Sequence, residues 1–214
     1  MTKRRSLPVR APDAIRRAAI LNAAFSLLMQ RGYERTSTLD IVTRAKISKR
    51  ELYQLFDSKQ AILTACITAR AERMCRPLQL TAPQDHQTFV AVLRSFGSTF
   101  LREICDPAVV AVYRLAAIEA QRSPEVARMI DNAGREMNRA ALIRLLRHAQ
   151  SLGMLGAGDP STMASEFFGL LVGDLLLRLI LRVTDPPTSN EISRRARVAT
   201  EALVLLHAET NSKS

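Results

Sequence analysis

Proline divides this 214-residue chain into segments that read as helices. Its nine prolines are at positions 8, 12, 77, 83, 107, 124, 160, 186 and 187, and we interpret all of them as boundaries between stretches with helical apolar spacing. Leu, Ala and Arg are strong helix formers, and together they make up 83 residues. No segment alternates apolar and polar residues as a strand does. The sequence therefore predicts an all-α protein.

Positive charge is concentrated at the start of the chain. Residues 1–60 contain 13 basic and 5 acidic residues, a net charge of +8, whereas residues 61–214 contain 18 and 15, a net charge of +3. A local surplus of this size indicates a module that binds a polyanion, joined to a nearly neutral helical body.

Several classes of protein fit the sequence poorly. The longest apolar run, 167–180, contains Asp174 and Arg178, so we expect no membrane span or membrane partner. The basic N-terminus lacks the apolar core of a signal peptide, which favours a cytoplasmic protein. Three cysteines, Cys66, Cys75 and Cys105, form neither a disulfide framework nor a paired zinc site. We expect no cofactor and no metal.

Capping signals place the helices along the chain. Ser48 to Glu51 fits a capping box, as do Ser37 to Asp40 with Asp at the same offset, and Thr188 to Glu191. A cap followed by proline occurs at Asp106, Ser123 and Asp159. The expected helices run from about 13 to 30, a short one after Ser37, another short one after Ser48, one from 57 or 58 to about 76, and then about 84–104, 107–121, 124–151, 160–183 and 189–209.

Two of these short helices, separated by a tight break at 46–48 in a basic segment, predict a helix-turn-helix. The second helix would turn Leu52, Leu55 and Phe56 inward. Its opposite face carries Lys49, Arg50, Tyr53 and Gln54.

This segment resembles a known family. The residues that carry the resemblance are Ile20-Leu21, Ala23-Ala24-Phe25, Gly32-Tyr33, Thr36-Ser37-Thr38, Asp40-Ile41, Ser48-Lys49-Arg50, Leu52-Tyr53, Phe56 and Lys59. Over residues 14–63 the chain is similar to the DNA-binding domain of TetR-family transcriptional regulators. The stretch 113–125 is similar to the AefR-like subgroup. Lys46 and Val42 depart from the family pattern, which usually has Gly and Ala there.

The resemblance implies roles for individual residues. Thr38, Tyr53 and Lys59 would hold DNA phosphates, while Lys49 and Arg50 would reach base edges. Lys46 and Gln54 complete the expected DNA-binding set. A basic arm, residues 1–12, would bring Arg4, Arg5 and Arg10 to the backbone or the minor groove. Simpler interpretations stay open: Tyr53 could shield the core edge, Glu51 could serve only as a cap, and the arm could make no ordered contact.

The resemblance also implies a domain plan. Residues 1–58 would form the arm and DNA-binding domain, 59–80 a connecting helix, and 81–214 a ligand-binding and dimerisation domain. The expected function is a repressor that acts as a homodimer on double-stranded DNA and is released from a pseudo-palindromic operator by a small-molecule effector.

Two sets of residues in the body follow from this plan. The 160–183 helix is apolar almost all round and should be covered by a second chain, together with the 189–209 helix. The expected dimer interface is Gly169, Gly173, Asp174, Leu177, Arg178, Ala199 and Leu203. The expected ligand pocket is Phe96, Phe100, Tyr113, Arg114, Met129, Met137 and Phe167, although such residues are more often ordinary core.

Other functions fit the sequence less well. The three histidines, His86, His148 and His207, are far apart in sequence, and no Gly-rich phosphate loop is present, so we do not expect an enzyme. A thiol-based redox regulator and a sequence-independent architectural DNA-binding protein remain as alternatives.

Overall fold

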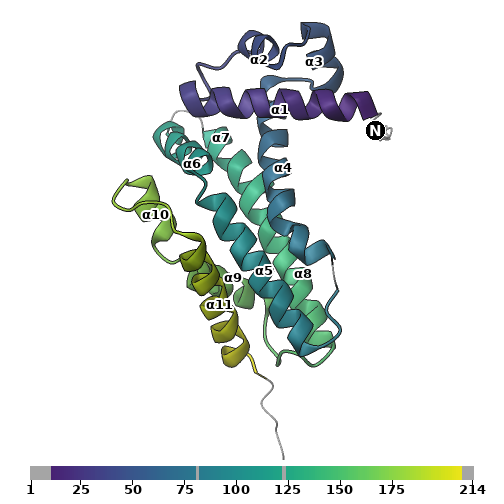
Figure 1. Ribbon diagram of the computed structural model, residues 1–214, viewed down its shortest axis with the longest axis vertical. Helices are drawn as coiled ribbons and strands as arrows, with labels where there is room; N and C mark the ends of the chain where they lie inside the picture. The colour runs from purple at the N-terminus through teal and green to yellow at the C-terminus, as the bar shows by residue number, and fades with distance from the viewer. Residues whose placement is uncertain (1–10, 81, 122–123, 209–214) are drawn as a thin grey trace, which may run out of the picture. The chain divides into compact units, whose positions relative to one another are not determined.

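The computed structural model describes residues 11–80, 82–121 and 124–208, and these contain helices and no β-strand. The predicted all-α fold is therefore confirmed. The chain divides into two compact units, Met1–Ile67 and Thr68–Ser214. The boundary between them falls inside one helix, α4 (Lys59–Leu80), which is drawn in blue in Figure 1.

The first unit contains three helices and the beginning of α4. These are α1 (Ala11–Arg31), α2 (Thr38–Ala45) and α3 (Lys49–Leu55). Gly32 ends α1 in the left-handed region (φ 80°), and its amide bonds to the Leu28 carbonyl at 2.9 Å, as an αL cap requires. The core of the unit comprises Ile20, Ala24, Leu27, Ile41, Val42, Leu52, Phe56, Ile62 and Cys66.

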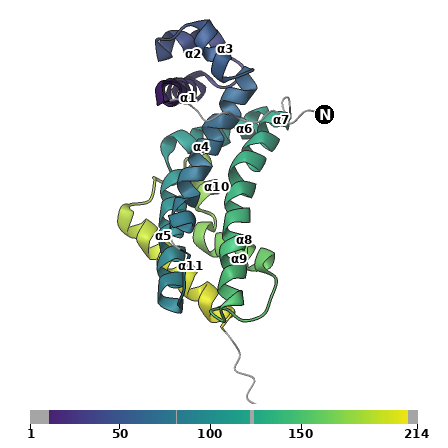
Figure 2. The ribbon, with the colours of Figure 1, turned by 90° about the vertical axis from the view of Figure 1, so that its right-hand side faces the viewer.

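The second unit is built from the remaining helices. They are α5 (His86–Ile104), α6 (Pro107–Glu119), α7 (Pro124–Ile130), α8 (Glu136–Ser151), α9 (Pro160–Val172), α10 (Leu175–Ile180) and α11 (Ser189–Leu206). In both views α11 packs along α5, and α9 packs against α8 and α11 (Figures 1 and 2). Close packing depends on Gly97, where a Cβ atom would come within 3.3 Å of the Ala196 Cβ.

Most of the predicted caps are present. Asp106 and Asp159 accept hydrogen bonds from first-turn amides of α6 and α9, each followed by proline. Thr188 accepts from the amide of Glu191 at 3.3 Å. The Glu191 carboxylate, however, pairs with Arg194 and Arg195, so the reciprocal half of the expected capping box is missing. Ser123 lies outside the described residues.

Two expected helix boundaries were wrong, and one expected helix, 124–151, has the expected ends but an irregular interior. Pro77 lies inside α4, which continues one further turn to Leu80, so not every proline marks a boundary. The expected 160–183 helix is broken at Gly173, which adopts φ 52° and ψ −130°. A β-carbon is strongly disfavoured in that region, and the chain restarts as α10 on a different axis. The expected 124–151 helix contains a π-helical turn, η1 (Asp131–Arg135), between α7 and α8.

A buried asparagine stabilises this π-turn. Asn138 is only 1% exposed, and its side-chain amide donates to the Gly134 carbonyl at 2.9 Å. Its side-chain oxygen accepts from the Cys75 thiol at 3.2 Å, and its amide also contacts the Met74 sulfur. One side chain thus links the π-turn to the second half of α4. Within the described residues, no helix is long and apolar enough to cross a bilayer.

Candidate DNA-binding surface and ligand cavity

Capping boxes set the starts of both short helices of the first unit. The Ser37 hydroxyl accepts from the Asp40 amide at 3.1 Å, and the Asp40 carboxylate accepts from the Ser37 amide at 2.9 Å. Ser48 and Glu51 repeat the arrangement at 3.2 and 2.8 Å. Both predicted boxes are confirmed. Hydrogen bonds from Ser37 and Ser48 lower the pKa values of Asp40 and Glu51 below their ordinary values.

The same carboxylates tie both helices to α1. Arg31 pairs with Asp40 at 3.2 Å, and Arg16 pairs with the second oxygen of Glu51 at 3.4 Å. Both oxygens of Glu51 are therefore engaged within the chain, and this favours the capping role over a base contact.

The turn between α2 and α3 is a Schellman motif centred on Lys46. Lys46 lies in the left-handed region (φ 54°, ψ 47°), and its amide is 3.4 Å from the Thr43 carbonyl. The Ile47 amide bonds to the Val42 carbonyl at 3.1 Å, and Ile47 packs on the core cluster that contains Val42. The lysine that departs from the family pattern thus adopts the turn conformation that glycine adopts without strain.

Beyond the turn, α3 presents a polar face to solvent. Its Leu52 is fully buried, while Lys49, Arg50 and Gln54 are exposed and Tyr53 is 51% exposed. The Tyr53 hydroxyl lies 3.5 Å from the Thr38 hydroxyl, which belongs to the first turn of α2. Two hydroxyl groups from different helices therefore meet beside the free amides of a helix N-terminus, a suitable arrangement for a phosphate oxygen.

Lys59 is engaged within the chain. Its ammonium donates to the Tyr33 carbonyl at 2.9 Å and lies 4.0 Å from the centre of the Tyr33 ring. An ammonium has three donor hydrogens, so this contact leaves room for a phosphate. Arg35 and Leu39, which were not among the expected DNA-binding residues, are also exposed in this unit. The arginines of the arm, Arg4, Arg5 and Arg10, lie outside the described residues.

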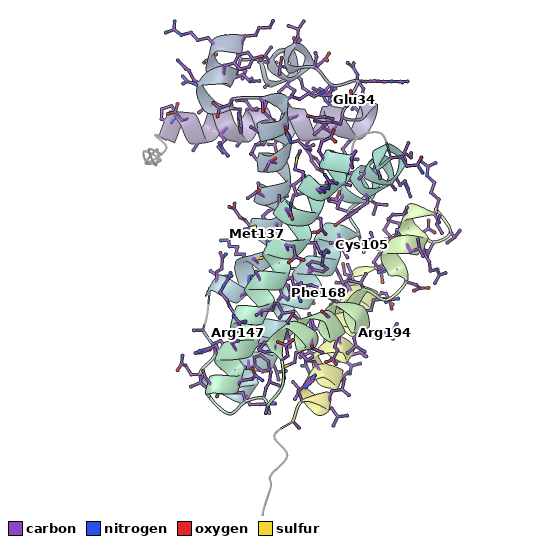
Figure 3. All side chains as sticks on the ribbon, turned by 180° about the vertical axis from the view of Figure 1, so that it is seen from behind. Glu34, Cys105, Met137, Arg147, Phe168 and Arg194 are labelled. Carbon is purple, nitrogen blue, oxygen red and sulfur yellow. The ribbon has the colours of Figure 1, made fainter. Side chains whose placement is uncertain are left out.

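The second unit contains a cavity of about 370 Å³ between its helices. It is lined by Phe100, Ile104, Tyr113, Arg135, Arg139, Ser165, Phe168, Gly169, Val172 and Leu176. Most of this lining is apolar, and its volume falls within the range of small-molecule sites. Phe168, labelled in Figure 3, contributes from α9.

Phe100 and Tyr113, two of the expected pocket residues, line this cavity. Phe96 and Phe167 are fully buried in the core beside it, with their rings 6.1 Å apart. Arg114 has a different role: it donates to the carbonyls of Leu179 and Ile180 and so caps the C-terminus of α10.

The last two expected pocket residues, Met129 and Met137, do not line the cavity. Met137, on the second residue of α8, is labelled in Figure 3. Arg135 and Arg139 were not expected in the pocket, because the sequence contains no clear sign of the π-turn that positions them. The only available signal was their spacing of four residues, which places them on one helix face.

Comparison with known proteins fits this geometry. Residues 20–66 match the family model for bacterial regulatory proteins of the tetR family. Residues 91–206, more than half of the chain, match the model for the C-terminal domain of AefR-like transcriptional repressors. The chain belongs to the TetR family. The predicted resemblance, including the AefR-like subgroup, is confirmed.

Individual TetR-family proteins show the extent of the likeness. The HTH-type transcriptional repressor Rv3405c of Mycobacterium tuberculosis is 29% identical over 130 residues, which are 61% of this chain and 64% of the relative. The chain thus spans about 64% of the length of the curated relatives it matches first.

Solved structures share the fold over most of the chain. The flavonoid-responsive regulator FrrA is 27% identical, with a TM-score of 0.70 over 92% of this chain and 99% of its own. A TetR-family regulator of Mesorhizobium loti is 21% identical, with a TM-score of 0.73 over 93% and 100%.

The expected dimer residues of this TetR-family chain fall into two groups. Ala199 and Leu203 are fully buried in the core of their own subunit, which corrects their assignment to an interface. Leu177 is 58% exposed, and Asp174 and Arg178 form an exposed pair at 4.0 Å.

The two expected interface glycines lie one turn apart at the end of α9. Gly173 forms the break after the helix, its amide bonds to the Gly169 carbonyl at 2.9 Å, and Gly169 is exposed and lines the cavity, so their place at a subunit interface stays a prediction. The large apolar side chains that α9, α10, α11 and the segment after α10 expose are Leu170, Leu177, Leu181, Val183, Val198, Leu205 and Leu206.

The three cysteines are buried thiols. Burial raises the pKa values of Cys75 and Cys105 to about 11, so both stay protonated at neutral pH. This chemistry does not support a thiol-based redox regulator. A sequence-independent architectural role likewise receives no support from the family match.

Proposed function

We propose that this TetR-family protein is a sequence-specific repressor that binds a pseudo-palindromic operator as a homodimer and is released by a small molecule. The observation that carries the proposal is the exposed face of α3, which presents Lys49, Arg50 and Gln54 to solvent, with the Tyr53 hydroxyl 3.5 Å from that of Thr38. In a helix-turn-helix the second helix enters the major groove.

The exposed basic and hydroxyl side chains of the first unit would have different roles on DNA. Arg50 can donate to guanine O6 and N7 in a bidentate pair, which is worth about 1–3 kcal/mol of discrimination against other bases. The Thr38 and Tyr53 hydroxyls and Lys46 would fix the register on the backbone and carry no sequence information. Lys59 would add a phosphate contact while it holds the Tyr33 carbonyl.

A second copy of the chain would cover the apolar side chains exposed on α9, α10, α11 and the segment after α10. Monomers rarely leave so many large apolar residues exposed on neighbouring elements, and a two-fold dimer would bury the same patch twice. Leu177→Arg should therefore shift the protein toward monomer in sedimentation analysis. Thr162→Arg, at an exposed position of α9, is a control that should leave the dimer intact.

The cavity of the second unit would bind the effector. Its volume and apolar lining suit a small molecule, and the likeness to FrrA, a regulator described as flavonoid-responsive, supports such a response. The ligand would act through different affinities for the DNA-bound and released conformations.

The test is a pull-down of genomic DNA fragments by the purified protein at about 150 mM salt, followed by sequencing, because salt sets the background of unspecific binding. A few pseudo-palindromic sites should be enriched. Arg50→Ala should relax the base preference at one position of each half-site. Arg147→Ala removes the same charge from α8, in the second unit, and should leave both enrichment and preference unchanged. Uniform loss of binding to all sequences by Arg50→Ala would reject its base-reading role.

A further inference from the structure

The cavity wall is aromatic on one side. The rings of Phe100 and Phe168 lie 4.9 Å apart and are tilted by 49°. Phe168 also contacts the buried rings of Phe96 and Phe167 at 6.1 and 6.0 Å, so the wall is held firmly from behind. Beside it, Gly169 has no atom within 4 Å of where its Cβ would be, which leaves open space next to the rings. A flat ring system suits such a wall.

The other side of the cavity is polar and basic. Tyr113 comes from α6, Arg135 from the π-turn, Arg139 from α8 and Ser165 from α9. The Ser165 hydroxyl donates to the Ser161 carbonyl at 3.0 Å, so it is committed to its own helix. The two guanidinium groups and the phenol are then the groups that can select a ligand.

The two arginines differ in how far neighbouring acids neutralise them. Arg135 binds both oxygens of Asp131 and pairs with Glu136 at 2.7 Å. The guanidinium of Arg139 makes only a long ion pair, 3.9 Å from a carboxylate oxygen of Glu136, and otherwise donates to the Ser161 hydroxyl. Its nearby carboxylate, Asp159, already accepts from the amides and the hydroxyl at the start of α9. Arg139 is therefore the cation in the cavity with charge and donors to spare.

Tyr113 supplies a neutral donor beside it. Burial and the Asp131 carboxylate raise its pKa above the ordinary value, so the hydroxyl remains a phenol at neutral pH. Tyr113 is half-buried and lines the cavity, so its hydroxyl can donate to a ligand oxygen there.

We propose that the cavity binds a small aromatic carboxylic acid, with its ring against Phe100 and Phe168 and its carboxylate on Arg139 and Tyr113. The inference rests on the proposed function, since it names the chemical class of the effector. A volume of about 370 Å³ equals that of about a dozen water molecules, which limits the acid to one or two rings.

The sequence offers a direct assay with 2-naphthoate as the probe. The chain has no tryptophan, so the fluorescence of the naphthalene ring can be followed without that background. The neutral 2-naphthamide has the same ring and shape, and octanoate has the carboxylate without the ring. The full-length protein should bind 2-naphthoate at least tenfold more tightly than either, because hydrogen bonds to charged groups are the stronger ones.

Variants identify the groups responsible. Arg139→Met should remove the preference for 2-naphthoate over 2-naphthamide, and Tyr113→Phe should reduce it several-fold. Arg147→Met is the matched control, since it removes an exposed arginine about 12 Å further along the same helix (Figure 3) and should leave the preference intact. Thermal denaturation of each variant shows that it is folded.

The outcomes separate this proposal from the proposed function. If naphthoate and naphthamide bind equally well, or if the preference for naphthoate survives Arg139→Met, the proposal that the ligand is a carboxylic acid held by Arg139 is wrong. If octanoate binds as tightly as naphthoate, the proposal that the ligand is aromatic is wrong. If naphthoate binds through Arg139 but leaves the affinity for enriched operator fragments unchanged, the ligand site stands and the effector role of the cavity fails.

Discussion

Lys46 offers a direct measurement of stored backbone strain. A residue with a β-carbon pays about 1–2 kcal/mol in the left-handed region, and Lys46 occupies that region at φ 54°. Glycine removes the clash but loses about 0.5–1 kcal/mol more conformational entropy on folding than other residues do. We therefore expect Lys46→Gly to stabilise the protein by about 0.5–1 kcal/mol. Lys46→Ala keeps the β-carbon and should gain almost nothing.

Urea denaturation followed by far-UV circular dichroism measures the difference. With a slope of about 2 kcal/mol per molar urea, the midpoint of Lys46→Gly should rise by about 0.3–0.5 M. Arg182 is an internal replicate: it ends α10 at φ 59° in the same Schellman geometry, so Arg182→Gly should gain a similar amount. If glycine and alanine at position 46 give equal stability, the strain argument is wrong.

Three further outcomes follow from the structure. Lys59→Ala should weaken binding to every DNA sequence, and in a titration against salt it should reduce the slope of log affinity against log salt concentration by about one unit. An unchanged slope would show that Lys59 does not contact a phosphate. The pKa of Glu51 lies below its ordinary value of 4.5, so its contribution to stability is complete above pH 4.5 and is lost as the pH falls through the folded value. The free energy of unfolding of Glu51→Gln should accordingly fall less steeply than that of the unmutated protein as the pH drops through that range. Parallel curves for the two proteins would contradict this. Gly169→Ala should raise stability by about 0.5–1 kcal/mol, or roughly 1–4 °C in Tm, because nothing obstructs the new methyl group; a weakened dimer in sedimentation would instead place Gly169 at the subunit interface.

Local signals in the sequence predict much of the fold. The Ser37 and Ser48 capping boxes and the αL cap at Gly32 depend on a few consecutive residues, so the sequence contains all the information they need. The same holds for the polar face of α3, because helical periodicity alone separates Leu52 from Arg50.

Features that depend on packing were not predictable in this way. Ala199 and Leu203 form an apolar stripe that suits either the core or an interface, and only the position of α5 assigns it to the core. Gly173 lies within a continuous apolar pattern that is typical of a helix, and only the structure shows that it adopts φ 52° and breaks the helix. The cavity draws its lining from α5, α6, η1, α8, α9 and α10, so no single periodic pattern identifies it.

The double attachment of Asn138 has a mechanical consequence inside the second unit. Its side chain bonds to the Gly134 carbonyl of the π-turn and to the Cys75 thiol of α4, and the next residue, Arg139, lines the cavity. A ligand that displaces the wall of the cavity at Arg139 would therefore also load the contact between the π-turn and the second half of α4, through one buried amide.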